Sequence, residues 1–186
     1  MTENNIRIYD NAMSPEDCKK IIELFETNKD QISKFNTGRK EYTEIDIDKF
    51  NTPWSETKEK FISMMKTHMN KFMKDVKIQI NDFPPIIDME NIRIKKYLPN
   101  DKDEFGPHVD SISIDSALRF LVFFIYLNDN DKGETAFPQL GVAAPCKKGS
   151  LLMFPPLWPW LHAGLKPVNK PKYMVGSYLH YKKNNG

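Results

Sequence analysis

Two stretches in the first half of the chain have apolar residues at the spacing of amphipathic helices. The first begins at Ser14-Pro15, with an N-cap serine and proline at the first helical position, and carries an apolar stripe of Cys18, Ile21, Ile22 and Phe25. The second begins at Thr52-Pro53 and runs to about Lys77, with its apolar stripe at Trp54, Phe61, Met65, Phe72 and Val76. We expect both helices to pack on the outside of a sheet.

After Pro84-Pro85 the pattern changes to that of strands. Residues 92–98 alternate, with one face formed by Arg93, Lys95 and Tyr97. Residues 119–127 form a nearly continuous apolar run, which is typical of a strand buried on both faces. Residues 150–154 and 173–181 predict further strands. The order of these elements predicts a mainly β protein of the α+β class, in which a barrel carries the N-terminal helices on one outer face.

The composition indicates one globular domain over residues 1–186, with helical support at about 14–77 and a β core at about 86–181. The chain is 40% hydrophobic and 12% aromatic, which argues against disorder. Its 27 basic and 25 acidic residues are spread along the chain, so we expect no dedicated nucleic-acid surface. The polar N-terminus lacks the pattern of a signal peptide, and no apolar run is long enough for a membrane span. We therefore expect a cytoplasmic protein without a membrane partner, in which Cys18 and Cys146 are reduced.

Three residues in the second half form a candidate metal site. His108 and Asp110 lie at positions i and i+2, so on an extended strand both side chains would point to the same face. His162, which lies 52 residues after Asp110, could return on another strand and complete a set of two histidines and one carboxylate. This set is typical of non-haem Fe(II) oxygenases. The same donors also hold zinc, so the ligands alone leave both metals open. His68, alone on a helix face, is expected to be a packing residue.

Six motifs in a fixed order give the chain a resemblance to a known family. They are His108-x-Asp110, Tyr126-Leu127-Asn128, Gly133-Glu134-Thr135-x-Phe137-Pro138, Lys148-Gly149-Ser150-Leu151-Leu152-x-Phe154, His162-Ala163-Gly164 and Lys172-Tyr173. In order and in spacing they resemble those of the 2-oxoglutarate- and Fe(II)-dependent dioxygenases, most closely the prolyl 4-hydroxylase-like branch. The resemblance covers about residues 6–181 and implies a double-stranded β-helix (jelly-roll) core.

The resemblance also implies a cosubstrate site. Lys172 would bind the distal carboxylate of 2-oxoglutarate, with the hydroxyl of Tyr126 as a second contact, and Tyr97 matches a position that lines the same pocket. Lys172 and Met174 are two residues apart, so on a strand their side chains point to the same face. Lys172 is therefore expected to face the barrel interior, where an unpaired ammonium group is costly. A dicarboxylate would supply the missing counter-charge. The implied reaction uses Fe(II), O2 and 2-oxoglutarate, releases succinate and CO2, and is supported by ascorbate.

The resemblance favours a prolyl residue of a peptide or protein as the substrate. Members that act on peptidyl proline carry an Arg seven residues before the Tyr-Leu motif and a His eight residues after the Lys, and Arg119 and His180 occupy those positions. Trp158 precedes the distal ligand and could cradle a proline-rich peptide, although packing under the rim is an equal alternative. Many relatives have Tyr where this chain has Phe105, which leaves the substrate open.

Other functions within the same fold remain as alternatives. The enzyme could hydroxylate another side chain or a small molecule, or the barrel could bind a metal without turnover. A nucleic-acid demethylase is disfavoured, because that branch carries an Arg pair after its distal His and this chain has Lys172. Residues 30–50, which contain a turn at 36–40 between two possible short strands, and the charged loop at 99–107 are expected to flank the mouth and to order over the substrate.

Overall fold

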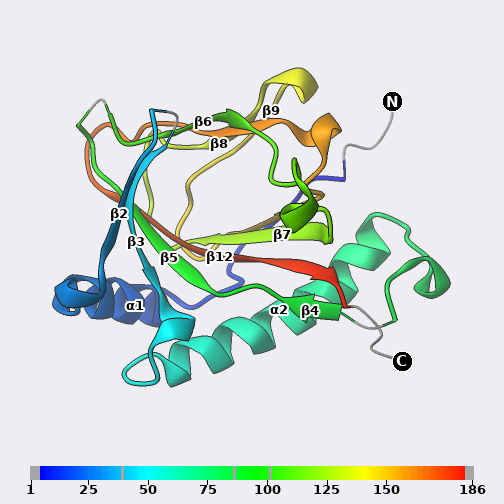
Figure 1. The fold of residues 1–186 in the computed structure, drawn as a ribbon, viewed down its shortest axis with the longest axis horizontal. Coiled ribbons are helices and arrows are strands. Elements are labelled where there is room, and N and C mark those ends of the chain that lie inside the picture. The colour runs from blue at the N-terminus through cyan, green and yellow to red at the C-terminus, as the bar shows by residue number, and fades with distance from the viewer. Residues whose placement is uncertain (1–4, 39, 86, 101, 183–186) are drawn as a thin grey trace.

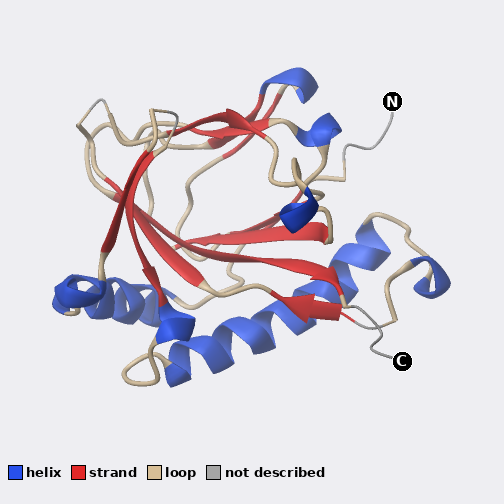
Figure 2. Cartoon of the chain, in the orientation of Figure 1, coloured by secondary structure: helices blue, strands red, loops and turns tan. Residues whose placement is uncertain are grey.

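Most of the chain is folded into two sheets with helices on one side. The computed structural model describes residues 5–38, 40–85, 87–100 and 102–182, and within these ranges it contains two α-helices and twelve strands. Figure 1 shows a large sheet, a smaller sheet facing it, and both helices beneath the large sheet. Figure 2 separates these layers by secondary structure. The mainly β architecture with helices on one outer face is the one that the sequence predicts.

The helices are α1 (Pro15–Thr27) and α2 (Ser55–Asp75). The large sheet has the strand order β1 (Arg7–Tyr9), β10 (Leu151–Phe154), β7 (Arg119–Tyr126), β12 (Lys172–Tyr181), β5 (Arg93–Tyr97), β3 (Glu41–Asp46) and β2 (Ser33–Asn36), and β4 (Ile87–Met89) also pairs with β12. The small sheet has the order β6 (Phe105–His108), β11 (His162–Gly164), β8 (Thr135–Phe137) and β9 (Val142–Ala144). These pairs are all antiparallel.

The two helix starts differ in how well the sequence predicts them. Helix α1 begins as expected, because the Ser14 side chain accepts a hydrogen bond from the backbone N–H of Asp17. Helix α2 begins two residues later than the predicted Pro53, since its first helical bond runs from the N–H of Lys58 to the carbonyl oxygen of Trp54. It ends before Lys77, which adopts a left-handed backbone conformation with φ 60°.

Strand β7 is buried on both faces and separates two layers of core. Alternate residues point to opposite faces of a strand. Phe123 and Ile125 therefore pack in the layer between the large sheet and the helices, whereas Phe124 and Tyr126 pack in the layer between the two sheets. A fully buried aromatic or aliphatic side chain of this kind stabilises the fold by about 1.5–3 kcal/mol. The apolar run at 119–127 is thus a central strand, as predicted.

Strand β12 crosses the middle of the large sheet in close contact with β7. Gly176 of β12 lies opposite Phe124 in the register. A Cβ atom at Gly176 would overlap the ring of Phe124 and would lie 2.9 Å from the carbonyl oxygen of Phe123. The absence of a side chain here lets the two strands approach. On its other edge β12 pairs with β5, and Lys172, at the start of β12, lies opposite Tyr97.

The structure gives the bounds of the strands in two stretches that the sequence describes coarsely. The predicted loop at 99–107 is shorter, because residues from Phe105 onward form β6 and pair with β11. Residues 30–50 contain the two expected short strands, β2 and β3, which pair with each other and are flanked by 3₁₀ helices at Lys29–Gln31 and Ile47–Lys49. The predicted turn at 36–40 includes residue 39, which lies outside the described residues. Within the described part of the chain, no helix has the length and apolar character needed to cross a membrane.

Candidate metal and cosubstrate site

The two histidines and the aspartate of the candidate metal site lie together at the edge of the small sheet. His108 ends β6 and His162 begins β11, and the two are direct partners in the register of these strands. Asp110 Oδ1 is 3.5 Å from His108 Nε2, and Asp110 Oδ2 is 3.3 Å from His162 Nε2. One ligand atom from each residue lies within 4.8 Å of the others, which is a separation that one metal ion can bridge.

Asp110 reaches this position by a route different from the predicted one. The sequence argument places His108 and Asp110 on the same strand, but β6 ends at His108 and the chain bends at Asp110. The backbone N–H of Asp110 donates to the carbonyl oxygen of Pro156 at 3.1 Å. A tertiary hydrogen bond to the loop before His162, and not strand alternation, therefore brings the carboxylate to the histidines.

Hydrogen bonds around the three residues orient their ligand atoms toward one point. The Nδ1 atom of His108 lies 2.8 Å from the carbonyl oxygen of Gly106, and that of His162 lies 3.0 Å from the carbonyl oxygen of Trp160. A carbonyl oxygen can only accept, so both Nδ1 atoms donate and both Nε2 lone pairs remain for a metal. The hydroxyl of Tyr178 donates to Asp110 Oδ1 at 2.9 Å.

The charges of these groups suit a cation. Burial by itself raises the pKa of Asp110, but its polar neighbours His108, His162 and Tyr178 outweigh burial and lower this pKa to about 2. Burial lowers the pKa of His162 to about 4, against the attraction of Asp110. At neutral pH the carboxylate is therefore ionised and His162 neutral, which are the ligating forms. Asp110 Oδ2 is buried without a hydrogen-bond partner among the described residues, a lack that a metal ion would satisfy.

His68 lies away from this cluster, as the sequence predicts. It is on α2, where its ring packs against that of Tyr9, and its Nδ1 atom bonds to the carbonyl oxygen of Met64. In the part of the chain that the structure describes, His108, Asp110 and His162 are the one group of metal-ligating side chains that meets at a point.

A narrow cavity runs from the three residues into the space between the sheets. Its lining includes Tyr97, Thr135, Gly164 and Met174. The ammonium group of Lys172 lies behind this lining, since a Cβ atom on Gly164 would be 3.7 Å from Lys172 Nζ. The metal ligands therefore line the cavity, and an ammonium group lies directly behind its Gly164 wall.

Lys172 is buried, as its strand parity predicts, with 1% of its surface exposed. Its Nζ donates to the carbonyl oxygens of Gly133 at 3.0 Å and Leu165 at 3.1 Å, and lies 4.4 Å from the ring centroid of Tyr97. Among the described residues no carboxylate lies within ion-pair distance of it. Burial lowers the pKa of Lys172 to about 8. A ligand carboxylate would supply the counter-charge that the protein does not.

The hydroxyl of Tyr126 is close to this cavity but is separated from it by another residue. It lies 2.6 Å from Thr135 Oγ1, and Thr135 is the residue that lines the cavity. Sequence reasoning singled out Tyr126 and Tyr97 and missed the parts of Thr135, Gly164 and Met174. The first two of these lie within the quoted motifs, but a threonine or glycine in a strand gives no chemical signal of its own.

Comparisons with known proteins agree on the fold. No protein-family model matches the sequence, and no curated protein matches it significantly. Among solved structures, a viral collagen prolyl hydroxylase from Paramecium bursaria Chlorella virus-1, in its 2OG complex, has a TM-score of 0.69 at 19% identity, over 96% of this chain and 97% of that one. A Pseudomonas putida prolyl-4-hydroxylase has a TM-score of 0.72 at 10% identity, over 97% and 94%.

A third solved structure extends this agreement. The prolyl hydroxylase of Trichoplax adhaerens, in complex with a peptide fragment of the hypoxia inducible factor oxygen degradation domain, has a TM-score of 0.70 at 14% identity, over 95% and 84%. This chain has the prolyl hydroxylase fold.

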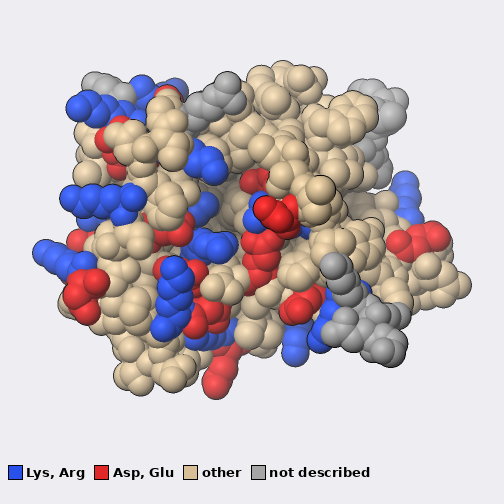
Figure 3. Space-filling view, viewed as in Figure 1, with Lys and Arg blue, Asp and Glu red and all other residues tan. Residues whose placement is uncertain are grey.

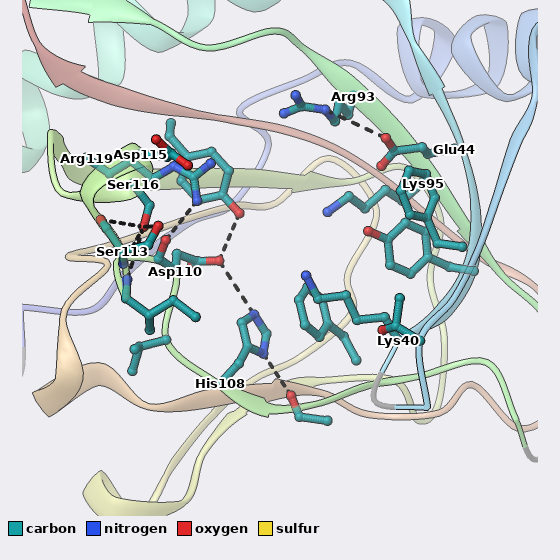
Figure 4. A pocket seen from close by; sticks show the side chains of 18 of the residues that line it. Lys40, Glu44, Arg93, Lys95, His108, Asp110, Ser113, Asp115, Ser116 and Arg119 are labelled. Carbon is teal, nitrogen blue, oxygen red and sulfur yellow. Dashed lines mark hydrogen bonds and ion pairs between the residues drawn. The ribbon is translucent and has the colours of Figure 1, made fainter.

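In this prolyl hydroxylase fold an open cleft of about 710 Å³ lies in front of His108 and Asp110. Its walls come from the β2–β3 hairpin, from β5 and from the loop that follows Asp110. Figure 3 shows the hollow in the middle of this face, with basic and acidic side chains around it. Figure 4 shows the side chains that line it, including Glu44 and Lys95, neither of which the sequence indicated as part of a site.

The three predicted substrate contacts differ in their positions relative to this cleft. Arg119 lines the cleft. It donates two hydrogen bonds to Glu90 and one, at 2.8 Å, to the carbonyl oxygen of Asp110. Its Cζ atom lies 4.1 Å from the ring centroid of Tyr178. His180 pairs with Arg119 between β12 and β7 but is not part of the lining. Trp158, 77% exposed, also lies outside the lining.

Proposed function

We propose that the protein is an Fe(II)- and 2-oxoglutarate-dependent dioxygenase of the prolyl 4-hydroxylase-like branch. We also propose that residues 1–186 form a single catalytic domain with a double-stranded β-helix core. One observation carries the proposal: a two-histidine, one-carboxylate cluster lines a narrow cavity, and behind the Gly164 part of that lining lies the buried ammonium group of Lys172, which has no carboxylate partner among the described residues. A zinc site would explain the cluster but not the buried ammonium group of Lys172.

The residues present fit iron and the cosubstrate. Nε2 of His108, Nε2 of His162 and a carboxylate oxygen of Asp110 would hold Fe(II) and leave three positions open for 2-oxoglutarate and O2. When bound, iron and cosubstrate supply the oxidative decarboxylation of 2-oxoglutarate to succinate and CO2, coupled to insertion of one oxygen atom into a substrate C–H bond. Ascorbate is expected to support this activity.

The protein's own contribution is binding and orientation. Lys172 would pair with the distal carboxylate of 2-oxoglutarate while the ring of Tyr97 packs beside it. Tyr126 would act on the same carboxylate directly or through the hydroxyl of Thr135, to which it is bonded. Tyr178 and Arg119 hold Asp110 in place from two sides, one at its carboxylate and one at its backbone. The buried cavity keeps water away from the reacting groups.

For the substrate we propose a prolyl residue of a peptide or protein. Three solved structures with this fold are named prolyl hydroxylases, and one of them holds a peptide. The open cleft beside the metal ligands has room for a segment of extended chain. Arg119 and His180 are proposed to position the peptide, with Trp158 at the outer rim. Hydroxylation of another side chain or of a small molecule is the second candidate, favoured by the charged lining of the cleft.

Succinate release tests whether the protein is an enzyme of this class. The purified protein is mixed with Fe(II), ascorbate, 2-oxoglutarate and O2, with Asp110→Ala as the inactive control and His68→Ala as the matched active control. We expect succinate from wild type and from His68→Ala. If wild type releases no succinate, either with a peptide or in the uncoupled reaction without one, the enzyme proposal is wrong.

A peptide panel tests the substrate. Proline-containing peptides are screened by mass spectrometry for the gain of one oxygen atom, with wild type and Arg119→Ala side by side. Because Arg119 also bonds to the backbone of Asp110, Fe(II) binding is measured in Arg119→Ala as well. Hydroxyproline that is lost in Arg119→Ala while Fe(II) binding and substrate-independent succinate release persist supports the proline proposal. Oxygen gain confined to non-prolyl substrates rejects it and leaves the cosubstrate assignment intact.

A further inference from the structure

The cleft lining contains three lysines that the proposed reaction does not use, Lys40, Lys49 and Lys95, and two of them, Lys40 and Lys95, lie near the ring of Phe105. Lys95 of β5 lines both the open cleft and the narrow cavity beside the metal ligands, so it stands where the two join. Lys40 lines the open cleft. Figure 4 shows both side chains extending toward His108 and Asp110.

An aromatic ring holds both lysines close to a metal ligand. Lys40 Nζ lies 4.3 Å and Lys95 Nζ 5.8 Å from the ring centroid of Phe105. That ring is stacked on the imidazole of His108, with the centroids 3.5 Å apart and the planes 4° from parallel. A group bound by the two ammonium groups would therefore lie next to the reaction centre.

Neither lysine has a carboxylate partner among the described residues, whereas the arginines of the cleft do. Arg119 is bound by Glu90. Arg93 Nε lies 3.7 Å from Glu44 Oε1 and 4.0 Å from Asp46 Oδ2. Three carboxylates, those of Glu90, Glu44 and Asp46, thus contact the two guanidinium groups, whereas none of them lies within ion-pair distance of Lys95 or Lys40.

Glu44 is the carboxylate that the strand register places opposite Lys95. The two are direct partners in the register of β3 and β5, so their side chains start from neighbouring positions on one face. Yet no contact within ion-pair distance forms among the described atoms, and Figure 4 shows Glu44 beside Arg93 and Lys95 directed toward Asp110. Burial lowers the pKa of Lys95, and the charges of Glu44 and Asp110 offset this effect only in part.

We propose that Lys95 and Lys40 form an anion site at the junction of cleft and cavity, and that the substrate carries a carboxylate next to the residue that is hydroxylated. This inference rests on the proposed function and narrows its substrate to an acidic peptide. The carboxylate can come from an Asp or Glu side chain or from the C-terminus of the peptide, and the two sources present the same chemistry to the lysines.

Binding of matched peptides tests the site. Four labelled peptides of equal length carry a central proline: three are capped at both ends and have Glu, Gln or Lys beside the proline, and one ends in a free carboxylate beside it. Fluorescence anisotropy is measured with the full chain, Fe(II) and 2-oxoglutarate under anaerobic conditions, so that binding occurs without turnover. We expect a peptide with a carboxylate to bind at least about tenfold more tightly than the Gln peptide, and the Lys peptide least tightly.

Three variants separate this site from the cosubstrate site and from general charge effects. Lys95→Gln is expected to abolish the preference for a carboxylate, and Lys95→Glu to reverse it toward the Lys peptide. Lys96→Gln is the matched control, because Lys96 is the next residue of β5 and pairs with Glu26 outside the cleft. The affinity for 2-oxoglutarate, measured by calorimetry, is expected to be unchanged in Lys95→Gln.

Each contrary result overturns the proposal. The proposal is wrong if wild type binds all peptides equally, prefers the Lys peptide, or binds neither acidic peptide. It is also wrong if Lys95→Gln loses as much affinity for 2-oxoglutarate as Lys172→Ala does. Comparison of the Glu peptide with the free-carboxylate peptide identifies the source of the anion. Failure of the proposed function is distinct, because it appears as a lack of succinate release in wild type without any peptide.

Discussion

At the scale of single residues, the candidate site depends on hydrogen bonds that set the state of each side chain. The carbonyl oxygens of Gly106 and Trp160 accept from the Nδ1 atoms of the two histidines, so both Nε2 atoms are available. Tyr178 satisfies one oxygen of Asp110 and leaves the other without a partner among the described residues. The site is therefore preorganised for a cation before one binds.

Removal of any one of the three ligands is expected to abolish Fe(II) binding. In His108→Ala, Asp110→Ala and His162→Ala, we expect the Fe(II) affinity to fall by more than the roughly 10- to 100-fold that loss of an outer hydrogen-bond partner causes. Anaerobic calorimetry measures this affinity, and circular dichroism checks that the fold persists. His68→Ala should match wild type. A variant of His68 that loses iron with its fold intact would show that the ligand set is wrong.

The affinity for 2-oxoglutarate is expected to fall as the pH rises through about 8. Burial lowers the pKa of Lys172 from 10.5 to about 8, so above that pH the free protein holds a neutral amine that cannot pair with a carboxylate. Binding above pH 8 should therefore take up a proton, because the bound carboxylate raises this pKa again.

Calorimetry in buffers of different ionisation enthalpy detects this proton uptake. Lys172→Arg, which stays charged, is the control and should lose the pH dependence. A cosubstrate affinity of wild type that is constant across this pH range would contradict the role given to Lys172.

At the scale of elements, the pairing of β7 with β12 sets the distance between the two core layers. Gly176→Ala would force a methyl group into the ring of Phe124 and toward a backbone carbonyl group that cannot move alone. We expect it to reduce the free energy of unfolding by about 1–3 kcal/mol, measured by urea denaturation.

The control for this prediction is Gly38→Ala. Gly38 has φ +74°, and no atom lies within 4 Å of the place that an added methyl group would occupy, so this variant carries only the backbone cost of roughly 1 kcal/mol. If both variants lose the same amount, steric contact at Gly176 is not what the strand pairing depends on.

The β2–β3 hairpin is the element that we expect to respond to a substrate. Phe35, Tyr42 and Glu44 of this hairpin line the open cleft, so a bound peptide would contact it. Amide hydrogen exchange in residues 33–46 should slow when peptide is added, while exchange in α1, on the far side of the large sheet, stays the same. Unchanged exchange in the hairpin with peptide bound would rule out its closure over substrate.

At the scale of the whole molecule, the two core layers share the central strands. Because β7 contributes alternate residues to both, neither layer can be lost while the other keeps its full packing. We expect a single calorimetric transition in which the calorimetric and van't Hoff enthalpies agree.

Fe(II) with 2-oxoglutarate should raise the Tm of this transition, because ligands at one hundred times the Kd add about 2.7 kcal/mol to the free energy of unfolding. A separate early transition of the helices would show that residues 14–77 fold independently and that the chain is not one cooperative domain.

Elements whose signals are local could be predicted from the order of amino acids alone. An N-cap serine accepts a hydrogen bond from a free backbone N–H in the first turn of its own helix, so the start of α1 was predictable directly. A long apolar run must be buried wherever it lies, so β7 was predictable as a central strand. The order of the motifs also indicated His108, Asp110, His162 and Lys172 as one site, because these residue types are costly or unusual in a β core without a ligand.

Features that depend on contacts between distant segments required the folded chain. Asp110 reaches the histidines through a bond to the carbonyl oxygen of Pro156, and β6 exists because it pairs with β11. Lys95 and Glu44 have the charges of an ordinary ion pair on neighbouring strands. Only the folded chain shows that Glu44 lies beside Arg93 and that Lys95 is directed toward the metal ligands. A charge shows its role only when its neighbours are known, since Coulomb attraction depends on distances that no linear spacing contains.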